Sequence, residues 1–148
     1  MDAFDSGVLI YAAVPGHPLG RRVAALLGAP GRRQRIGSYL LLTELLSKPL
    51  RDGHADEVRV LAGLLARLDL LPLDRATAEL ATVVAAKYGL RAADAVHLAT
   101  AIGMGADRFV TSNKRDFSAG IKEIDITYPD QLPDPEPPDD SDVPSMPS

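Results

Sequence analysis

Apolar residues recur along the chain in two patterns, which predict helices that alternate with short strands. Apolar positions three or four residues apart are typical of amphipathic helices, and they occur at residues 19–28, 39–47, 55–68 and 77–87. Short apolar runs between them predict strands, near Ala3 and at residues 36–37, 70–73, 108–111 and 121–127. Strands alternating with helices favour a parallel sheet with helices on both faces. The expected fold class is therefore α/β.

Capping residues predict where some of these helices begin and end. Asp5 or Ser6 is expected to cap a helix that starts near Val8. Ser38 is a good N-cap residue and directly precedes the helix predicted at residues 39–47. We expect Pro49 to end that helix, because proline has no backbone N–H to continue the hydrogen-bond ladder.

The stretch at residues 90–117 combines an almost wholly apolar helix with a strand that ends in polar residues. A helix that is apolar all round is usually buried, yet Asp94 lies in its first turn. The strand is followed directly by Ser112, Asn113, Lys114, Arg115 and Asp116. Because open α/β sheets bind ligands just past the carboxyl ends of their strands, we expect a functional site here.

Four carboxylates stand out by their context, and they are Asp5, Glu44, Asp94 and Asp116. Each alone has an ordinary explanation as a cap, an ion-pair partner or a loop acid. Together they have a second explanation, which is a shared site. A parallel sheet places Asp5 and Asp116 at the same edge, and Glu44 and Asp94 can point toward that edge. Carboxylates ~4 Å apart repel by roughly 4 kcal/mol per pair at an effective dielectric near 20. Such a cluster needs protons or cations.

The chemistry of these side chains narrows the choice of cation and of reaction. The chain has no cysteine, and oxygen ligands alone select hard ions such as Mg²⁺ or Mn²⁺. These ions bind substrate phosphates and lower the pKa of bound water. The reaction that such a site supports is metal-assisted hydrolysis of a phosphodiester bond.

Length and charge divide the chain into a body and a tail. The 148 residues suffice for one domain, expected at residues 1–128. The formal charge of −4 includes six acids and no base in residues 129–148, so the body carries +2. This acidic, proline-rich tail is expected to be disordered and either solvating or a mimic of nucleic acid. Without a signal peptide or a membrane-spanning run, the protein is expected in the cytoplasm.

The segments FDSGVLIY, S-x5-EL from Ser38 to Leu45, ADAVHLATA and FVTSNKRDF stand in this order along the chain. Their types and spacing resemble the PIN-domain family, and within it the VapC-like ribonuclease toxins of bacterial toxin–antitoxin modules. The resemblance covers residues 3–128. It implies a three-layer α/β/α sandwich with a central parallel sheet, an endoribonuclease that requires Mg²⁺ or Mn²⁺, and a homodimer that a cognate antitoxin protein neutralises.

Carried over by motif, the resemblance assigns catalytic and metal-binding roles to Asp5, Glu44, Asp94 and Asp116. Many relatives have an acid where this chain has Asn113, whereas others keep asparagine there and an acid at the position of Asp116. Because Asn113 brings no charge, a weaker second metal position is expected, with Asp116 acting directly or through water. Supporting contacts to the ligands or to the phosphate are expected from Ser6, Thr111, Ser112 and Asn113.

Two further features leave alternatives open. His97 shares a helix face with Asp94. It is either a metal ligand or general base or, as we favour, a histidine that supports a metal ligand or lies in the core hydrogen-bonded to backbone. The arginines between Arg21 and Arg35 form an RNA-binding surface, a solvated face or a docking site for an acidic antitoxin segment.

Two other functions compete with the nuclease. A haloacid-dehalogenase-type phosphatase needs an acid two residues after its nucleophilic aspartate, and Gly7 stands there instead. A catalytically silent PIN-like module, which only binds a protein or RNA partner, remains an alternative because Asn113 carries no charge.

Overall fold

A five-stranded, fully parallel sheet forms the centre of the computed structural model, which describes residues 1–135. The strands lie in the order β3-β2-β1-β4-β5. Their bounds are β1 Asp2–Phe4, β2 Arg35–Ser38, β3 Asp69–Leu71, β4 Arg108–Val110 and β5 Asp125–Thr127. The first strand in sequence therefore lies in the middle of the sheet, and the chain builds outward from it on both sides.

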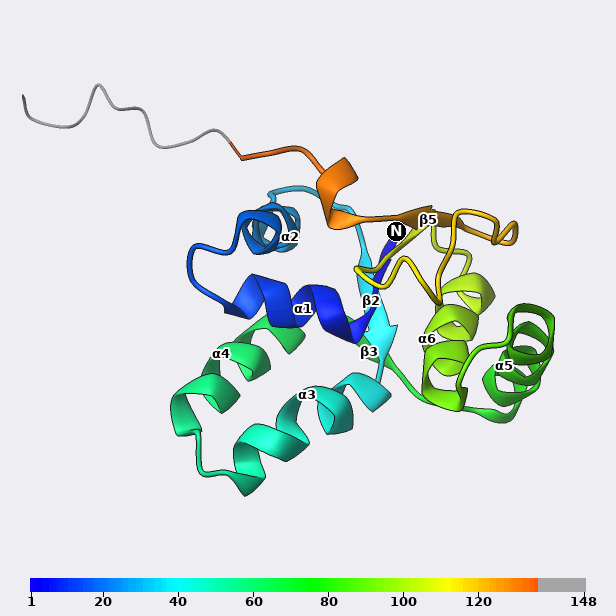
Figure 1. Cartoon of the computed structure of the whole chain (residues 1–148), viewed down its shortest axis with the longest axis horizontal. Helices are drawn as coiled ribbons and strands as arrows, with labels where there is room; N and C mark the ends of the chain where they lie inside the picture. Colours follow the sequence, from blue (N-terminus) through cyan, green and yellow to red (C-terminus); the bar gives the residue numbers. More distant parts are fainter. Residues whose placement is uncertain (136–148) are drawn as a thin grey trace, which may run out of the picture.

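Helices cover the sheet in two separate layers (Figure 1). The first layer holds α1 Ser6–Ala13, α2 Pro18–Gly28, α3 Leu40–Arg51 and α4 Ala55–Leu65. The second holds α5 Arg75–Tyr88 and α6 Ala92–Gly103. The chain moves outward from β1 to β3 and then returns to the other side of β1. Because parallel crossovers are right-handed, this reversal places the later helices on the opposite face, which confirms the three-layer α/β/α sandwich.

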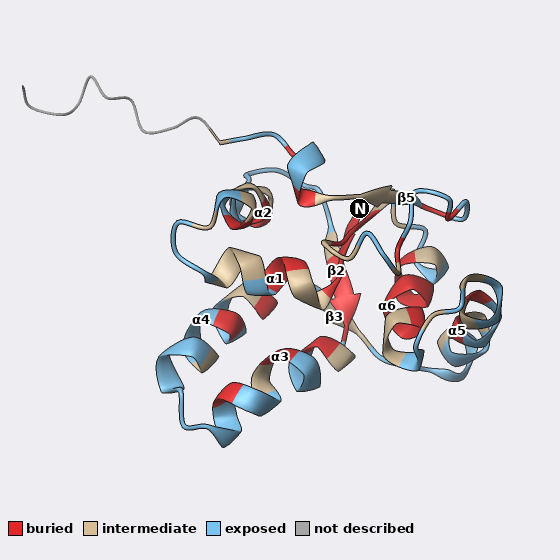
Figure 2. Ribbon diagram, viewed as in Figure 1, coloured by how far each residue is buried: buried red, intermediate tan, exposed pale blue. Residues whose placement is uncertain are grey.

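Alternate residues of the central strands face the two helical layers. Ala3 and Phe109 belong to the apolar cluster under α5 and α6, whereas Phe4 and Val110 belong to the cluster under the first four helices. This alternation follows from the two-residue period of a strand. Figure 2 shows that the residues of the central strands and the inward sides of the helices are buried. None of the helices found in residues 1–135 is long and apolar enough to cross a membrane.

Side-chain caps set the start of the helices that matter for the site. The Asp5 carboxylate accepts a hydrogen bond from the Ser6 backbone N–H at 2.8 Å, so α1 starts directly after β1 rather than near Val8. The hydroxyl of Ser38 accepts from the backbone N–H of Leu40 at 3.1 Å. Ser38 itself still belongs to β2, and it supports the start of α3 from the strand end.

The prediction that Pro49 ends its helix is wrong, because α3 continues to Arg51. Pro49 lies in the last turn, where proline removes a single hydrogen bond, and its ring is buried against the rest of the protein. By contrast, α4 is shorter than predicted and ends at Leu65 instead of Leu68. The N–H of Leu68 bonds to the carbonyl of Leu65 at 3.0 Å, a tight turn that ends the helix.

The crossing of α1 and α2 depends on a glycine. A Cβ at Gly20 would lie 2.0 Å from the carbonyl oxygen of Tyr11 in α1, so no other residue fits between the two backbones. His17 caps α2 just before this point, where its Nδ1 accepts from the N–H of Gly20 at 3.0 Å. The close approach brings the backbones of α1 and α2 into direct contact.

The chain continues past β5 as a strap, residues 128–134, which packs against α2. It contains the 3₁₀-helix Pro129–Gln131. Leu132 is buried among residues of α1 and α2, and Arg22 donates to two strap carbonyls at 3.0 and 2.9 Å. This packing differs from the disorder expected for the start of the tail, because a buried leucine and contacts to basic side chains hold it. Residues 136–148 lie outside the described part of the chain.

Two glycine-to-alanine substitutions are expected to change stability in opposite directions. Gly89 ends α5 with a φ of 67°, so Gly89→Ala is expected to destabilise the protein by about 1–2 kcal/mol through left-handed backbone strain. Gly63 lies inside α4, and a Cβ there meets nothing within 4 Å. Gly63→Ala is therefore expected to stabilise by about 0.5–1 kcal/mol. Chemical denaturation of both variants checks this, and equal shifts would contradict it.

Candidate active site

The sheet reverses its direction of growth between β1 and β4, and the candidate site lies at the carboxyl ends of these two strands. Phe4 at the end of β1 pairs with Val110 at the end of β4, so the residues that follow, Asp5 and Thr111, are neighbours. The Thr111 hydroxyl donates to the Asp5 carboxylate at 2.8 Å. Such a reversal point is where open α/β sheets bind ligands.

Asp5 is almost fully buried, with 5% of its surface exposed. Burial raises the pKa of its carboxyl, and the hydrogen bond from Thr111 only partly opposes this. One carboxylate oxygen accepts from the N–H of Ser6 and the other from Thr111. Both oxygens keep a further lone pair, so Asp5 can still hold a cation.

The loop after β4 forms a compact corner around Asn113. The backbone N–H of Asn113 donates to the Thr111 hydroxyl at 3.1 Å. Its side-chain amide donates to the Asp116 carboxylate at 2.9 Å, and its amide oxygen accepts from the Asp116 N–H at 3.1 Å. Hydrogen bonds thus run from Asp5 through Thr111 and Asn113 to Asp116, and Asn113 uses both ends of its amide to fix Asp116.

Asp94 lies in the first turn of α6, as expected, and is partly buried. Burial raises the pKa of Asp94, and the negative charges of Asp5 and Asp116 raise it further, with a smaller contribution from Glu44. The four acids therefore share one electrostatic environment, although they come from four different segments of the chain.

Glu44 reaches this environment from α3, where its carboxylate is hydrogen-bonded to Nε2 of His97. His97 is buried as expected, but its partner is a carboxylate from the other helical layer rather than a backbone group. Sequence spacing could not reveal the pair, since the two residues are 53 positions apart.

Two predicted hydroxyl groups flank the acids. Ser6 and Ser112 are both partly exposed, at the start of α1 and in the loop after β4. A Cβ at Gly7 would lie 2.6 Å from the hydroxyl oxygen of Ser112, so the loop packs closely on the first turn of α1. Because glycine has no side chain, Gly7 leaves room for Ser112 at this edge.

The donor set suits a hard divalent cation in its chemistry. It consists of carboxylate oxygens. Burial raises the pKa of Asp5 and Asp94, and repulsion from neighbouring carboxylates adds to this. A nearby cation opposes both effects. As the side chains lie, no three His, Asp or Glu residues within residues 1–135 are close enough to ligate one ion. Side-chain rotations would have to bring the carboxylates together around a metal.

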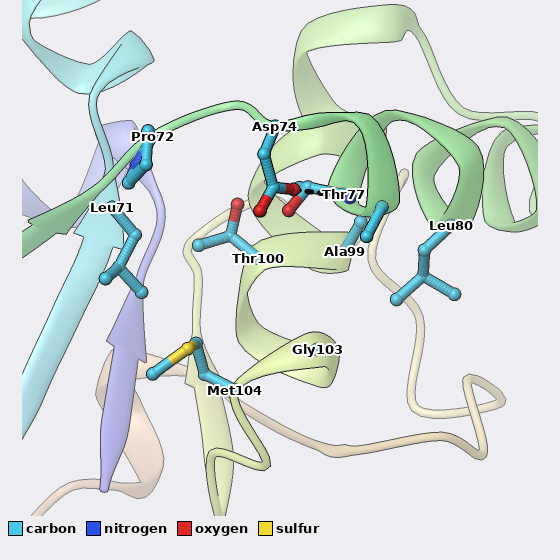
Figure 3. A pocket seen from close by; sticks show the side chains of 10 residues that line it. Leu71, Pro72, Asp74, Thr77, Leu80, Ala99, Thr100, Gly103 and Met104 are labelled. Carbon is cyan, nitrogen blue, oxygen red and sulfur yellow. Dashed lines mark hydrogen bonds between the residues drawn. The ribbon is translucent and has the colours of Figure 1, made fainter.

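A cavity of about 280 Å³ lies elsewhere, between the start of α5 and the second half of α6 (Figure 3). Leu71, Leu80 and Met104 contribute to its mainly apolar wall, with Asp74 and Thr100 as polar neighbours. None of the four acids lines it. The acids thus lie at the edge of the sheet and not in this cavity.

Most arginines between residues 21 and 35 have structural partners. Arg21 and Arg22 lie 3.6 and 3.7 Å from the strap acid Asp134. Arg33 pairs with a buried aspartate of β1, and Arg35 donates to two carbonyls around the end of α2. These arginines therefore contact the strap, the amino end of the sheet and the end of α2.

Solved structures of toxin–antitoxin complexes share this fold. A chain of such a complex from Klebsiella pneumoniae superposes with a TM-score of 0.67 at 24% identity, covering 87% of this chain and 98% of that chain. A chain of DNA-bound VapBC from Salmonella typhimurium gives 0.68 at 21% identity, covering 86% and 97%. A chain of VapBC2 from Rickettsia felis, bound to a promoter DNA fragment, gives 0.68 at 16% identity, covering 86% and 97%.

Comparison with protein-family models adds a match at the level of sequence. The model of the PIN domain matches residues 3–121. A comparison with curated proteins finds no match. The matched residues run from β1 through the loop after β4, so they include all four acids. Because this match spans most of the sequence, the chain belongs to the PIN domain family.

Proposed function

We propose that this protein is a metal-dependent endoribonuclease, the toxin of a toxin–antitoxin pair. The observation that carries the proposal is the meeting of Asp5, Glu44, Asp94 and Asp116 in one electrostatic environment at the reversal point of a PIN fold. Burial and neighbouring negative charges raise the pKa of Asp5 and Asp94, and shifted carboxyl groups at a ligand-binding edge are typical of functional sites.

Asp5, Asp94 and Glu44 would hold the metal, Mg²⁺ or Mn²⁺, and Asp116 would complete the site directly or through water. When bound, such an ion lowers the pKa of a coordinated water and neutralises charge on the phosphate. Asn113 holds the Asp116 carboxylate in place through its amide. Thr111 does the same for Asp5, so its hydroxyl supports a ligand rather than the substrate.

Ser6 and Ser112 are the hydroxyl groups proposed to meet the scissile phosphate. Both are partly exposed beside the acids, and no described hydrogen bond engages either hydroxyl. The position of the acids at an open sheet edge, outside the cavity of Figure 3, suits a long polymer better than a small molecule.

An antitoxin protein is the partner that the similar structures favour. These structures are toxin–antitoxin and VapBC complexes, two of them bound to DNA. We propose that this chain likewise binds a cognate antitoxin and forms a homodimer, and that it acts on RNA in the cytoplasm.

A silent PIN-like module that only binds a protein or RNA partner is the second candidate. Two observations favour it: the amide of Asn113 stands among the acids, and within the described residues no three ligands are gathered around one point. Metal titration separates the two candidates, since a silent module gains no thermal stability from Mn²⁺.

The deciding experiment uses the purified protein, free of antitoxin, on structured RNA. We expect cleavage with Mg²⁺ or Mn²⁺, none with excess EDTA, and recovery when the metal is restored. Double-stranded DNA of the same length serves as the control substrate. RNA cleavage that persists in EDTA would contradict the metal-dependent mechanism.

A further inference from the structure

We infer that His97 is a positioning residue for Glu44, which it holds in the orientation needed to bind the metal. The inference rests on the proposed function, because it assigns a task within the same site. His97 comes from α6 and Glu44 from α3, so their hydrogen bond joins the two helical layers.

The two side chains differ sharply in exposure. The imidazole of His97 is 1% exposed, whereas the side chain of Glu44 is 32% exposed. The carboxylate thus lies at the boundary between a fixed, buried ring and solvent. A long glutamate side chain at such a boundary samples several rotamers unless a partner fixes it.

The hydrogen bonds of the ring are committed to this one contact. Nδ1 of His97 is buried and has no partner among residues 1–135. We therefore assign the proton to Nε2, which donates to the Glu44 carboxylate. A buried ring nitrogen without a partner reduces stability, so a leucine of similar size would suit the fold alone at least as well. The histidine is thus better explained by what it does for Glu44.

The contact with His97 determines which oxygen of Glu44 is available to a metal. With one oxygen bound to His97, Glu44 has its second oxygen free for a cation. The charge of Glu44 contributes to the raised pKa of both Asp5 and Asp94, so the pair lies within range of the other ligands. Groups that orient metal ligands typically change metal affinity or activity by about 10–100-fold when they are removed.

The test compares His97→Leu, which removes the donor, with His97→Gln, whose amide reaches about as far as Nε2. Mn²⁺ affinity is measured by calorimetry without RNA, alongside RNA cleavage and the melting temperature. We expect His97→Leu to raise the Kd for Mn²⁺ about tenfold or more without lowering the melting temperature. His97→Gln should recover most of this loss.

Thr100→Val is the matched control. Thr100 is buried in the same helix, and its hydroxyl donates to the carbonyl of Val96 at 2.8 Å rather than to Glu44. We expect its Kd for Mn²⁺ to equal that of the unaltered protein. If His97→Leu fails to fold, His97→Asn replaces it, because the shorter amide does not reach Glu44.

The outcomes separate this inference from the proposed function. An unchanged Kd in His97→Leu, or a His97→Gln variant as weak as His97→Leu, overturns the positioning role while metal-dependent cleavage by the unaltered protein still supports the nuclease. If the unaltered protein neither binds Mn²⁺ nor cleaves RNA, the proposed function fails and takes this inference with it.

Discussion

Replacing Asp94 by asparagine is expected to reduce RNA cleavage by at least about 100-fold, the upper end of the loss seen when a residue merely supports a metal ligand. The substitution keeps the shape of the side chain and removes its negative charge, which lies near the charges of Asp5 and Asp116. Initial rates at saturating RNA and Mn²⁺ measure the loss. The stabilisation of the protein by Mn²⁺, measured as a thermal shift, should disappear with it.

The same variant has a second signature in the metal-free protein. Because the folded pKa of Asp94 is raised, its charged form opposes folding, and this penalty is relieved as the pH falls through the folded pKa. Asp94→Asn should therefore be at least as stable as the unaltered protein at neutral pH and gain less on mild acidification. Asp125→Asn, an exposed acid at the start of β5, is the control. Full activity in Asp94→Asn would contradict the proposed site.

Replacing Asp2 by alanine is expected to destabilise the protein by about 3 kcal/mol, the lower end of the cost of breaking a buried ion pair. Asp2 is fully buried in β1. Arg33 binds both of its oxygens at 2.7 and 2.6 Å, and Arg108 adds a bond at 2.8 Å. The lower end applies because both arginines reach solvent and stay hydrated after the change. Urea denaturation at neutral pH measures the loss.

The pH dependence of this network has the opposite sign to that of Asp94. Burial alone raises the pKa of Asp2, but hydrogen bonds from Arg33 and Arg108 and their charges outweigh it, so the pKa is lowered. Its contribution to stability is therefore complete above the unfolded pKa and is lost as the pH falls through the folded value.

An exposed ion pair serves as the control for Asp2, both at neutral pH and when stability is measured against falling pH. Glu79→Gln, which breaks the exposed pair with Arg75, should change stability far less. Equal losses of unfolding free energy in Asp2→Ala and Glu79→Gln would show that the buried network stabilises the protein no more than a surface ion pair does.

Much of the fold could be predicted from the spacing of apolar residues. The order of strands and helices is as predicted, because each element buries one face or is buried on both. Element ends were harder, and Pro49 shows why. Whether a proline ends a helix depends on the packing around it, which local sequence does not contain.

The candidate acids could be recognised because Asp94 and Glu44 interrupt apolar runs. Their partners could not be recognised, since the His97–Glu44 contact depends on how two helical layers meet over the sheet. The corner at Asn113 shows a similar limit. Its sequence indicates a missing charge, whereas its hydrogen bonds show an amide that holds the neighbouring acid.

Gly20 allows relatives to be sorted by sequence. Since a Cβ there would lie 2.0 Å from the Tyr11 carbonyl, homologues with the same α1–α2 crossing must keep glycine at this position. A homologue with a larger residue there has to hold its first two helices farther apart. Evolutionary change at this one position should therefore come with compensating change along the α1–α2 contact, and aligned sequences would divide into two groups by that feature.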